Sequence, residues 1–154
     1  MENKQINETQ TDGVEILLVE DSRRDAEVTI RALRKHNLSN HLVHVTDGQE
    51  ALDWLFGTGK YERRDTNHRP KVVLLDLKLP KVDGIEVLRA IRADPRTRRL
   101  PVVIMTSSRE QQDVIRSYDL GVNSYVVKPV DFESFSQAVA DLGHYWVLVN
   151  QEPK

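Results

Sequence analysis

The feature that most constrains this chain is a short apolar run that ends in a carboxylate, Val72 to Asp76. Four apolar residues, two of them β-branched, are typical of a strand buried on both faces of a parallel sheet. Asp76 follows the last of them, so we expect its side chain at the carboxyl edge of the sheet, where open α/β sheets bind ligands. Pro80 and Asp83-Gly84 then supply turn chemistry before a helical pattern resumes. The pattern predicts a functional site centred on Asp76.

An apolar strand followed by an amphipathic helix occurs five times in the 154 residues. The expected strands are 14–20, 41–45, 71–76, 101–106 and 125–127. The expected helices are 23–36, 48–56, 84–93, 111–120, with a capping box at Ser108 and Gln111, and a last one that begins after Asp131. Strands joined by helices require crossover connections, which predict a single α/β domain: a doubly wound, five-stranded parallel sheet with helices on both faces.

Composition excludes several classes of protein. The chain has no cysteine, a net charge of -2 and 30% charged residues, so it has no disulfide framework and no strong general attraction for nucleic acid. It has neither a run of about 20 apolar residues nor an apolar signal segment. We therefore expect a cytoplasmic protein without membrane or direct nucleic-acid contacts. Residues 1–13 are polar and without periodicity, which predicts a disordered leader.

Four of the predicted strands end in residues that can do chemistry. These are Glu20 and Asp21, Asp76, Thr106 and Lys128. In a parallel sheet such ends share one edge, so the side chains converge. Clustered carboxylates repel one another unless a cation lies among them, and oxygen ligands of this kind suit Mg²⁺. Asp76 could then attack a phosphorus atom, while Lys128 and Thr106 stabilise the phosphoryl oxygens.

This set, with Tyr125 three residues before Lys128 and Pro129 after it, resembles the receiver domain of two-component response regulators. The resemblance covers about residues 14–142. It implies a flavodoxin-like fold with strand order 2-1-3-4-5. It also implies a phosphoprotein of a phosphorelay, which accepts a phosphoryl group from a sensor histidine kinase and then changes its protein contacts. Such a domain is a phosphoacceptor and at most catalyses its own phosphorylation and dephosphorylation.

The resemblance also implies roles for individual residues. The phosphoacceptor would be Asp76, and the Mg²⁺ ligands would be Glu20, Asp21, Asp76 and the backbone carbonyl of Lys78. The phosphoryl-binding and switch residues would be Thr106, Lys128 and Tyr125, and the Lys128–Pro129 peptide bond would be cis.

Two further segments indicate a particular group within this family. The long polar loop 57–70 and the aromatic C-terminal extension 143–154 are similar to those of stand-alone, single-domain regulators partnered with bacterial and cyanobacterial phytochrome kinases. A loop of that length is usually functional or mobile.

The extension contains an apolar run of five residues, 145–149. The spacing of its apolar residues predicts that the last helix continues through Gly143. Alternatively, Gly143 ends the helix and the residues after it form an exposed arm. Such a run either folds back on the domain or forms an interface. We expect a symmetric homodimer, with Tyr145, Trp146 and Val149 as contacts.

Other functions on this fold are alternatives. A phosphohydrolase of the aspartyl-phosphate kind usually has a second Asp two residues after the nucleophile, where this chain has Lys78. A flavin or nucleotide binder requires a glycine-rich loop after the first strand, where Glu20 and Asp21 stand and would repel phosphate. A scaffold that works without phosphorylation would not need the acidic set and the lysine.

Overall fold

The strands of the protein are short and apolar, and they form one parallel sheet. The computed structural model describes residues 14–38, 41–129 and 131–151, so the expected leader 1–13 lies outside the described residues. The strands are β1 (Ile16–Val19), β2 (Leu42–Val45), β3 (Val72–Leu75), β4 (Val102–Thr106) and β5 (Ser124–Val127). Their order is β2-β1-β3-β4-β5 with every pair parallel, which confirms the expected fold. The inner strands are buried throughout, and β5 at one edge is half-buried.

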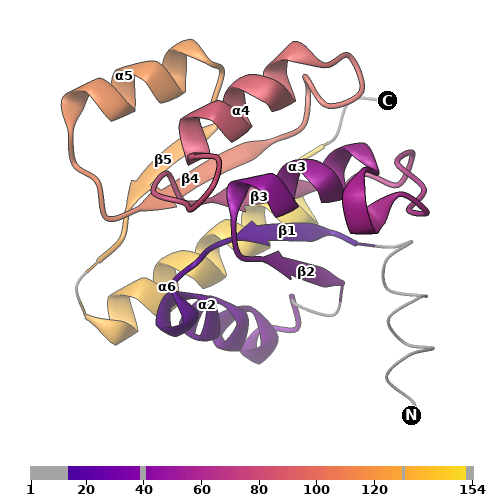
Figure 1. Ribbon diagram of the computed structural model, residues 1–154. Helices are drawn as coiled ribbons and strands as arrows, with labels where there is room; N and C mark the ends of the chain where they lie inside the picture. Colours follow the sequence, from indigo (N-terminus) through magenta and orange to yellow (C-terminus); the bar gives the residue numbers. More distant parts are fainter. Residues whose placement is uncertain (1–13, 39–40, 130, 152–154) are drawn as a thin grey trace.

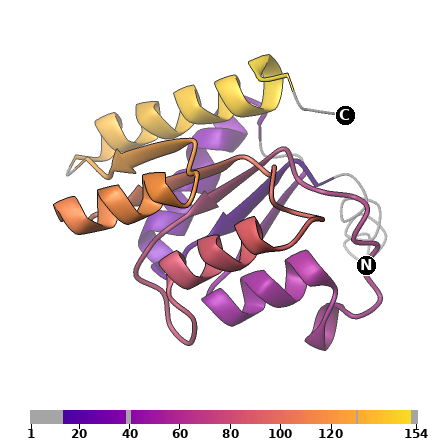
Figure 2. The same cartoon turned by 90° about the horizontal axis from the view of Figure 1, so that it is seen from above.

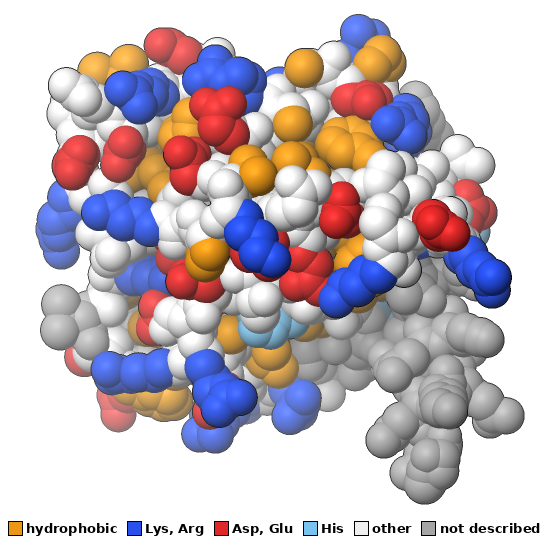
Figure 3. All heavy atoms as spheres, in the orientation of Figure 1, with side chains coloured by type: hydrophobic (Ala, Val, Ile, Leu, Met, Phe, Trp, Pro, Cys, Tyr) orange, Lys and Arg blue, Asp and Glu red, His pale blue; other side chains and the backbone are white. Residues whose placement is uncertain are grey.

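Helices cover both faces of the sheet. They are α2 (Arg23–Lys35), α3 (Gly48–Phe56), α4 (Gly84–Ala93), α5 (Gln111–Asp119) and α6 (Phe132–Gly143), with a 3₁₀ turn η1 (Gly59–Tyr61) and a π-helix η2 (His144–Val149). In Figures 1 and 2, α2 and α6 lie together on one face, and α3, α4 and α5 lie on the other. No helix in the described residues is long and apolar enough to cross a bilayer. On the face in Figure 3, acidic and basic side chains are interspersed among the described residues.

Side-chain caps start four of the helices. Ser22, Asp47, Asp83 and Asp131 each accept a hydrogen bond from the backbone N–H three residues later, over 2.7–3.2 Å.

The start of α5 differs from the prediction. Its N-cap is Glu110, which makes no side-chain cap bond, so the predicted capping box is wrong. Ser108 Oγ donates to Asp113 Oδ2 at 2.6 Å and accepts from the backbone N–H of Glu110 at 3.3 Å, whereas in the predicted box it would accept from the N–H of Gln111.

The C-terminal extension is helical and packs on its own domain. The helix continues through Gly143, where a methyl group would collide with the side chain of Leu33 on α2, so glycine permits the close packing of α6 on α2. Trp146 and Val147 of η2 are buried in the core on that face. Lys71 Nζ donates to the Val147 carbonyl at 3.1 Å and so ties η2 to the sheet. The expectation that Trp146 is a dimer contact is therefore wrong, since the side chain fills the monomer core.

The long loop after α3 is also packed. Tyr61 of η1 donates its hydroxyl to Glu50 at 2.8 Å, and Lys60 pairs with the same carboxylate at 3.0 Å. The guanidinium of Arg64 stacks on the buried ring of Trp54, 3.6 Å from the ring centroid. These contacts hold the loop along α3.

We predict that Trp146→Ala lowers the free energy of unfolding by about 3 kcal/mol, because it removes a large side chain from the core. Leu148→Ala, at an exposed position of the same π-helix, should change it by less than about 0.5 kcal/mol. Urea denaturation monitored by circular dichroism measures both values. Equal effects of the two variants would show that the extension does not pack on the domain.

Candidate functional site

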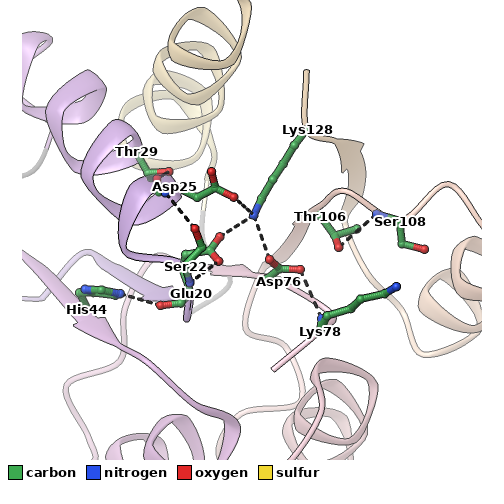
Figure 4. Close-up of polar contacts among 10 residues, drawn as sticks. All are labelled: Glu20, Ser22, Asp25, Thr29, His44, Asp76, Lys78, Thr106, Ser108 and Lys128. Atoms are coloured by element: carbon green, nitrogen blue, oxygen red, sulfur yellow. Dashed lines mark hydrogen bonds and ion pairs between the residues drawn. The ribbon is translucent and has the colours of Figure 1, made fainter. Parts of the chain in front are cut away.

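The hydrogen-bond ladder of the sheet positions the side chains at its carboxyl edge. The backbone N–H of Asp76 donates to Val19 at 3.1 Å, and that of Lys128 donates to Thr106 at 2.7 Å. Each of these residues thus extends the parallel pairing by one position beyond its strand. Figure 4 shows the outcome: side chains that follow β1, β3 and β5 point toward one another. The structure brings Glu20, Asp76 and Lys128 together as the topology predicts.

The centre of the site is the ammonium group of Lys128. Its Nζ lies 2.7 Å from Glu20 Oε1, 2.7 Å from Asp25 Oδ2 and 2.9 Å from Asp76 Oδ2. The lysine side chain is only 9% exposed. An ammonium group has three hydrogens, so these carboxylates occupy all of its donors.

Sequence reasoning missed Asp25. It lies in the first turn of α2, where an acidic residue is commonly explained by the helix dipole. The available signal was its position three residues after the N-cap Ser22, which places it in the helical turn that directly follows the end of β1.

Three carboxylates form a second cluster beside the lysine. One oxygen each from Glu20, Asp21 and Asp76 lies within 4.8 Å of the others. Glu20 and Asp76 are buried and Asp21 is exposed, so the cluster opens to solvent on one side. This donor set fits a hard divalent cation, which prefers carboxylate oxygens and retained water. The carbonyl of Lys78 as a further ligand stays a prediction; the backbone N–H of Lys78 donates to Asp76 Oδ1 at 3.3 Å.

The environment holds Asp76 as an anion. Burial by itself raises the pKa of Asp76, but hydrogen bonds from Lys128 and Thr106 outweigh it, and the pKa lies below its ordinary value. Lys128 stays charged, because its bonds to Asp25, Glu20 and Asp76 raise its pKa despite burial. The arrangement therefore presents a buried carboxylate nucleophile next to a fixed cation.

Glu20 behaves differently from Asp76. Burial raises the pKa of Glu20 to about 7, against the opposing bond from Lys128, and the nearby charge of Asp76 adds to the rise. At neutral pH this carboxyl is thus partly protonated until a cation replaces the proton.

Thr106 and Tyr125 are connected through the loop that follows β4. The backbone N–H of Ser108 donates to Thr106 Oγ1 at 3.4 Å, and the Tyr125 hydroxyl donates to the Ser108 carbonyl at 3.0 Å. The half-buried Tyr125 therefore contacts the loop that begins at Thr106. A switch role for this pair stays a prediction.

One expectation about the site differs from the structure. The described residues contain no cis peptide bond, so the Lys128–Pro129 bond is trans and the cis prediction is wrong. The trans form is the more stable isomer of most bonds before proline, by about 0.5–1 kcal/mol.

Comparison with known proteins identifies the family. The model of the response regulator receiver domain matches residues 16–140. The chain belongs to this family, whose members accept a phosphoryl group from a kinase in two-component signalling.

Among its relatives is the response regulator Rcp1 of Synechocystis sp., which is 39% identical over 132 residues, 86% of this chain and 88% of Rcp1. The crystal structure of Mn²⁺-bound Rcp1 aligns with a TM-score of 0.84 at 37% identity, over 92% of this chain and 99% of that one. The phosphorylated cyanobacterial phytochrome response regulator RcpA aligns with a TM-score of 0.85, also at 37% identity and over the same shares. The bacteriophytochrome response regulator AtBRR is 55% identical, with a TM-score of 0.70, over 90% of this chain and 99% of AtBRR.

We predict that the affinity for a divalent cation falls as pH drops below about 7, because the ion must displace the proton of Glu20. The loss should be about tenfold in total between about pH 8 and about pH 6, because only the part of that range below the pKa contributes strongly. Calorimetric titration with Mn²⁺ at about pH 6 and about pH 8 measures it. Glu20→Gln is the control: it should bind more weakly at both pH values and with a flatter pH dependence. An affinity of the wild type that does not change over this range would contradict the prediction.

Proposed function

We propose that Asp76 is the phosphoacceptor of this receiver domain and that a sensor histidine kinase is its phosphodonor. The observation that carries the proposal is the state of Asp76: a buried carboxylate, held as an anion by Lys128 and Thr106, at the open edge of the sheet. Among the carboxylates of the site, Asp76 directly follows the central strand β3 and has both a cation, Lys128, and the hydroxyl of Thr106 as hydrogen-bond partners.

In the transfer step, an oxygen of Asp76 forms a bond to phosphorus as the phosphorus–nitrogen bond to the donor histidine breaks. The imidazole nitrogen leaves with the electron pair of that bond. Lys128 donates to one phosphoryl oxygen and Thr106 to another, so the charge of the transferring group is stabilised in place. A bound Mg²⁺, held by Glu20, Asp21 and Asp76 and by the expected carbonyl of Lys78, would supply further charge neutralisation there.

The signal would leave the site through the loop after β4. A phosphoryl group adds a charge of about -1.5 to -2, which draws the Thr106 hydroxyl toward Asp76. The loop that contains Ser108 then moves, and Tyr125, which donates to the Ser108 carbonyl, moves with it. The surface formed by α5, β5 and α6 would change its protein contacts as a result. Exposed Ile115 and Tyr118 on α5 give this surface apolar groups for a partner.

The partner kinase is inferred from the relatives. RcpA and AtBRR are phytochrome response regulators, and both align with nearly the whole of this chain. A cytoplasmic phytochrome histidine kinase is therefore the donor that we propose. The loop 94–101 precedes β4 and the loop after α3 precedes β3, so in this parallel sheet both lie at the edge opposite Asp76 and leave the approach of a donor histidine open.

We also propose a symmetric homodimer through η2. Tyr145, Leu148 and Val149 are 48%, 63% and 56% exposed, and together they form an apolar strip on the outer side of the π-helix. A strip of this kind favours pairing with a second copy, in which the same residues face one another.

We predict that Val149→Asp shifts this dimer to monomer, because each copy would place an unpaired carboxylate in the interface. Ile115→Asp, at a comparably exposed apolar position on α5, is the matched control and should leave the dimer intact. Sedimentation velocity over a range of concentrations measures both. A wild type that stays monomeric at high concentration would overturn the dimer proposal.

For phosphorylation, we predict that the intact protein gains one phosphoryl group during incubation with acetyl phosphate and Mg²⁺. The gain should disappear with EDTA and in Asp76→Asn, which keeps the shape of the side chain and removes the nucleophile. Intact-mass spectrometry measures the change. Asp83→Asn, which alters only a helix cap outside the site, should be phosphorylated like the wild type. An undiminished gain in Asp76→Asn would exclude Asp76 as the acceptor.

A further inference from the structure

Asp25 is the one carboxylate at the site for which the proposed function has no role. Its Oδ2 lies 2.7 Å from Lys128 Nζ, as close as any other acceptor of that lysine. Asp25 does not belong to the cluster of Glu20, Asp21 and Asp76 that can hold a cation. The first turn of α2 fixes its place, since its backbone N–H donates to Ser22 Oγ and its carbonyl accepts from Thr29 Oγ1. The contact with Lys128 is thus built into the start of the helix.

Lys128 has only three N–H donors for all of its acceptors. Glu20, Asp25 and Asp76 already accept all three, and a phosphoryl oxygen on Asp76 needs one of them. When Asp76 becomes an acyl phosphate, its own carboxylate charge is lost and its acceptor strength falls. Glu20 belongs to the cluster that would hold a cation. Asp25 is the one of the three acceptors that neither receives the phosphoryl group nor belongs to that cluster.

Asp25 and a phosphoryl group on Asp76 would attract the ammonium group of Lys128 in different directions. In Figure 4, Asp25 approaches the ammonium group of Lys128 from one side and Asp76 approaches it from another. An ammonium group held toward Asp25 is therefore held away from a phosphoryl oxygen on Asp76. The negative charge of Asp25 also opposes the arrival of any anionic phosphodonor.

We propose that Asp25 competes with the phosphoryl group on Asp76 for Lys128, and that it thereby weakens phosphoryl binding and slows phosphorylation by anionic donors. This inference rests on the proposed function of Asp76. Asp25 acts through Lys128 and is a positioning residue.

Partial exposure limits the size of the effect. The side chain of Asp25 is 28% exposed, and it lines a cavity of about 230 Å³ together with Lys128, Pro129 and Phe132. Solvent in this cavity screens the charge of Asp25. We therefore expect changes of about three- to tenfold, the range for a partly screened ion pair.

The first experiment measures binding of beryllofluoride, an anionic mimic of the phosphoryl group, in the presence of Mg²⁺. Asp25→Asn removes the charge and keeps an amide oxygen for Lys128. It should bind beryllofluoride about three- to tenfold more tightly than the wild type in a calorimetric titration. Glu27→Gln is the matched control, because Glu27 is an exposed acid on the same helix and makes no ion pair within the described residues. It should bind like the wild type.

The second experiment compares phosphorylation rates with two donors of different charge. If Asp25 had only a structural role, its substitution would change both rates by the same factor. Near neutral pH, acetyl phosphate is a dianion and phosphoramidate is largely a monoanion. Asp25→Asn should accelerate phosphorylation by acetyl phosphate more than phosphorylation by phosphoramidate. Rates follow from intact-mass time courses, and thermal melting monitored by circular dichroism establishes that each variant is folded.

The outcomes separate the two proposals. Tighter beryllofluoride binding and a donor-dependent acceleration in Asp25→Asn, both absent in Glu27→Gln, would support the competition. Unchanged or weaker binding in folded Asp25→Asn, with a wild type that is phosphorylated normally, would overturn the inference and leave the role of Asp76 intact. A wild type that neither binds beryllofluoride nor gains a phosphoryl group would overturn the proposed function, and the inference with it.

Discussion

The site depends on one ammonium group. Lys128 lies among the carboxylates of Glu20, Asp25 and Asp76, and all three contacts are 2.9 Å or shorter. Without this cation, carboxylates with little access to water would face one another, and an unpaired buried charge typically costs about 3–5 kcal/mol. The same cation keeps Asp76 ionised, which is the state a nucleophile requires. A stability requirement and a chemical requirement are thus met by the same side chain.

The parallel sheet is what makes that contact possible over long sequence separations. A functional residue directly follows each of these strands, and the hydrogen bonds of the sheet fix the position of its backbone. Two glycines tighten the loops around Asp76. A Cβ at Gly84 would collide with the backbone of Asp76 and Leu77, and one at Gly48 would collide with Val82. The loop after β3 is therefore clamped between the starts of α3 and α4, and Asp76 has little freedom to turn away from Lys128.

Much of this could be predicted from sequence, because apolar runs locate strands and parallel strands share an edge. Contacts that depend on the reach of a side chain could not be predicted. The sequence places Asp25 on a helix, but only the structure shows that Lys128 extends to it. Trp146 and Tyr145 are neighbours in one apolar run, and the winding of the π-helix decides which is buried. The isomer before Pro129 depends on an energy difference too small to infer from residue types.

The central claim is that Asp76, and no other carboxylate in the cluster, carries the phosphoryl group. The direct measurement is to phosphorylate the wild type, reduce the acyl phosphate with sodium borohydride and identify the modified residue by peptide mass spectrometry. Reduction converts a phosphorylated aspartate to homoserine and leaves free carboxylates unchanged. Our account predicts homoserine at position 76 alone. Conversion at Asp21 or Asp25, with Asp76 unmodified, would contradict it.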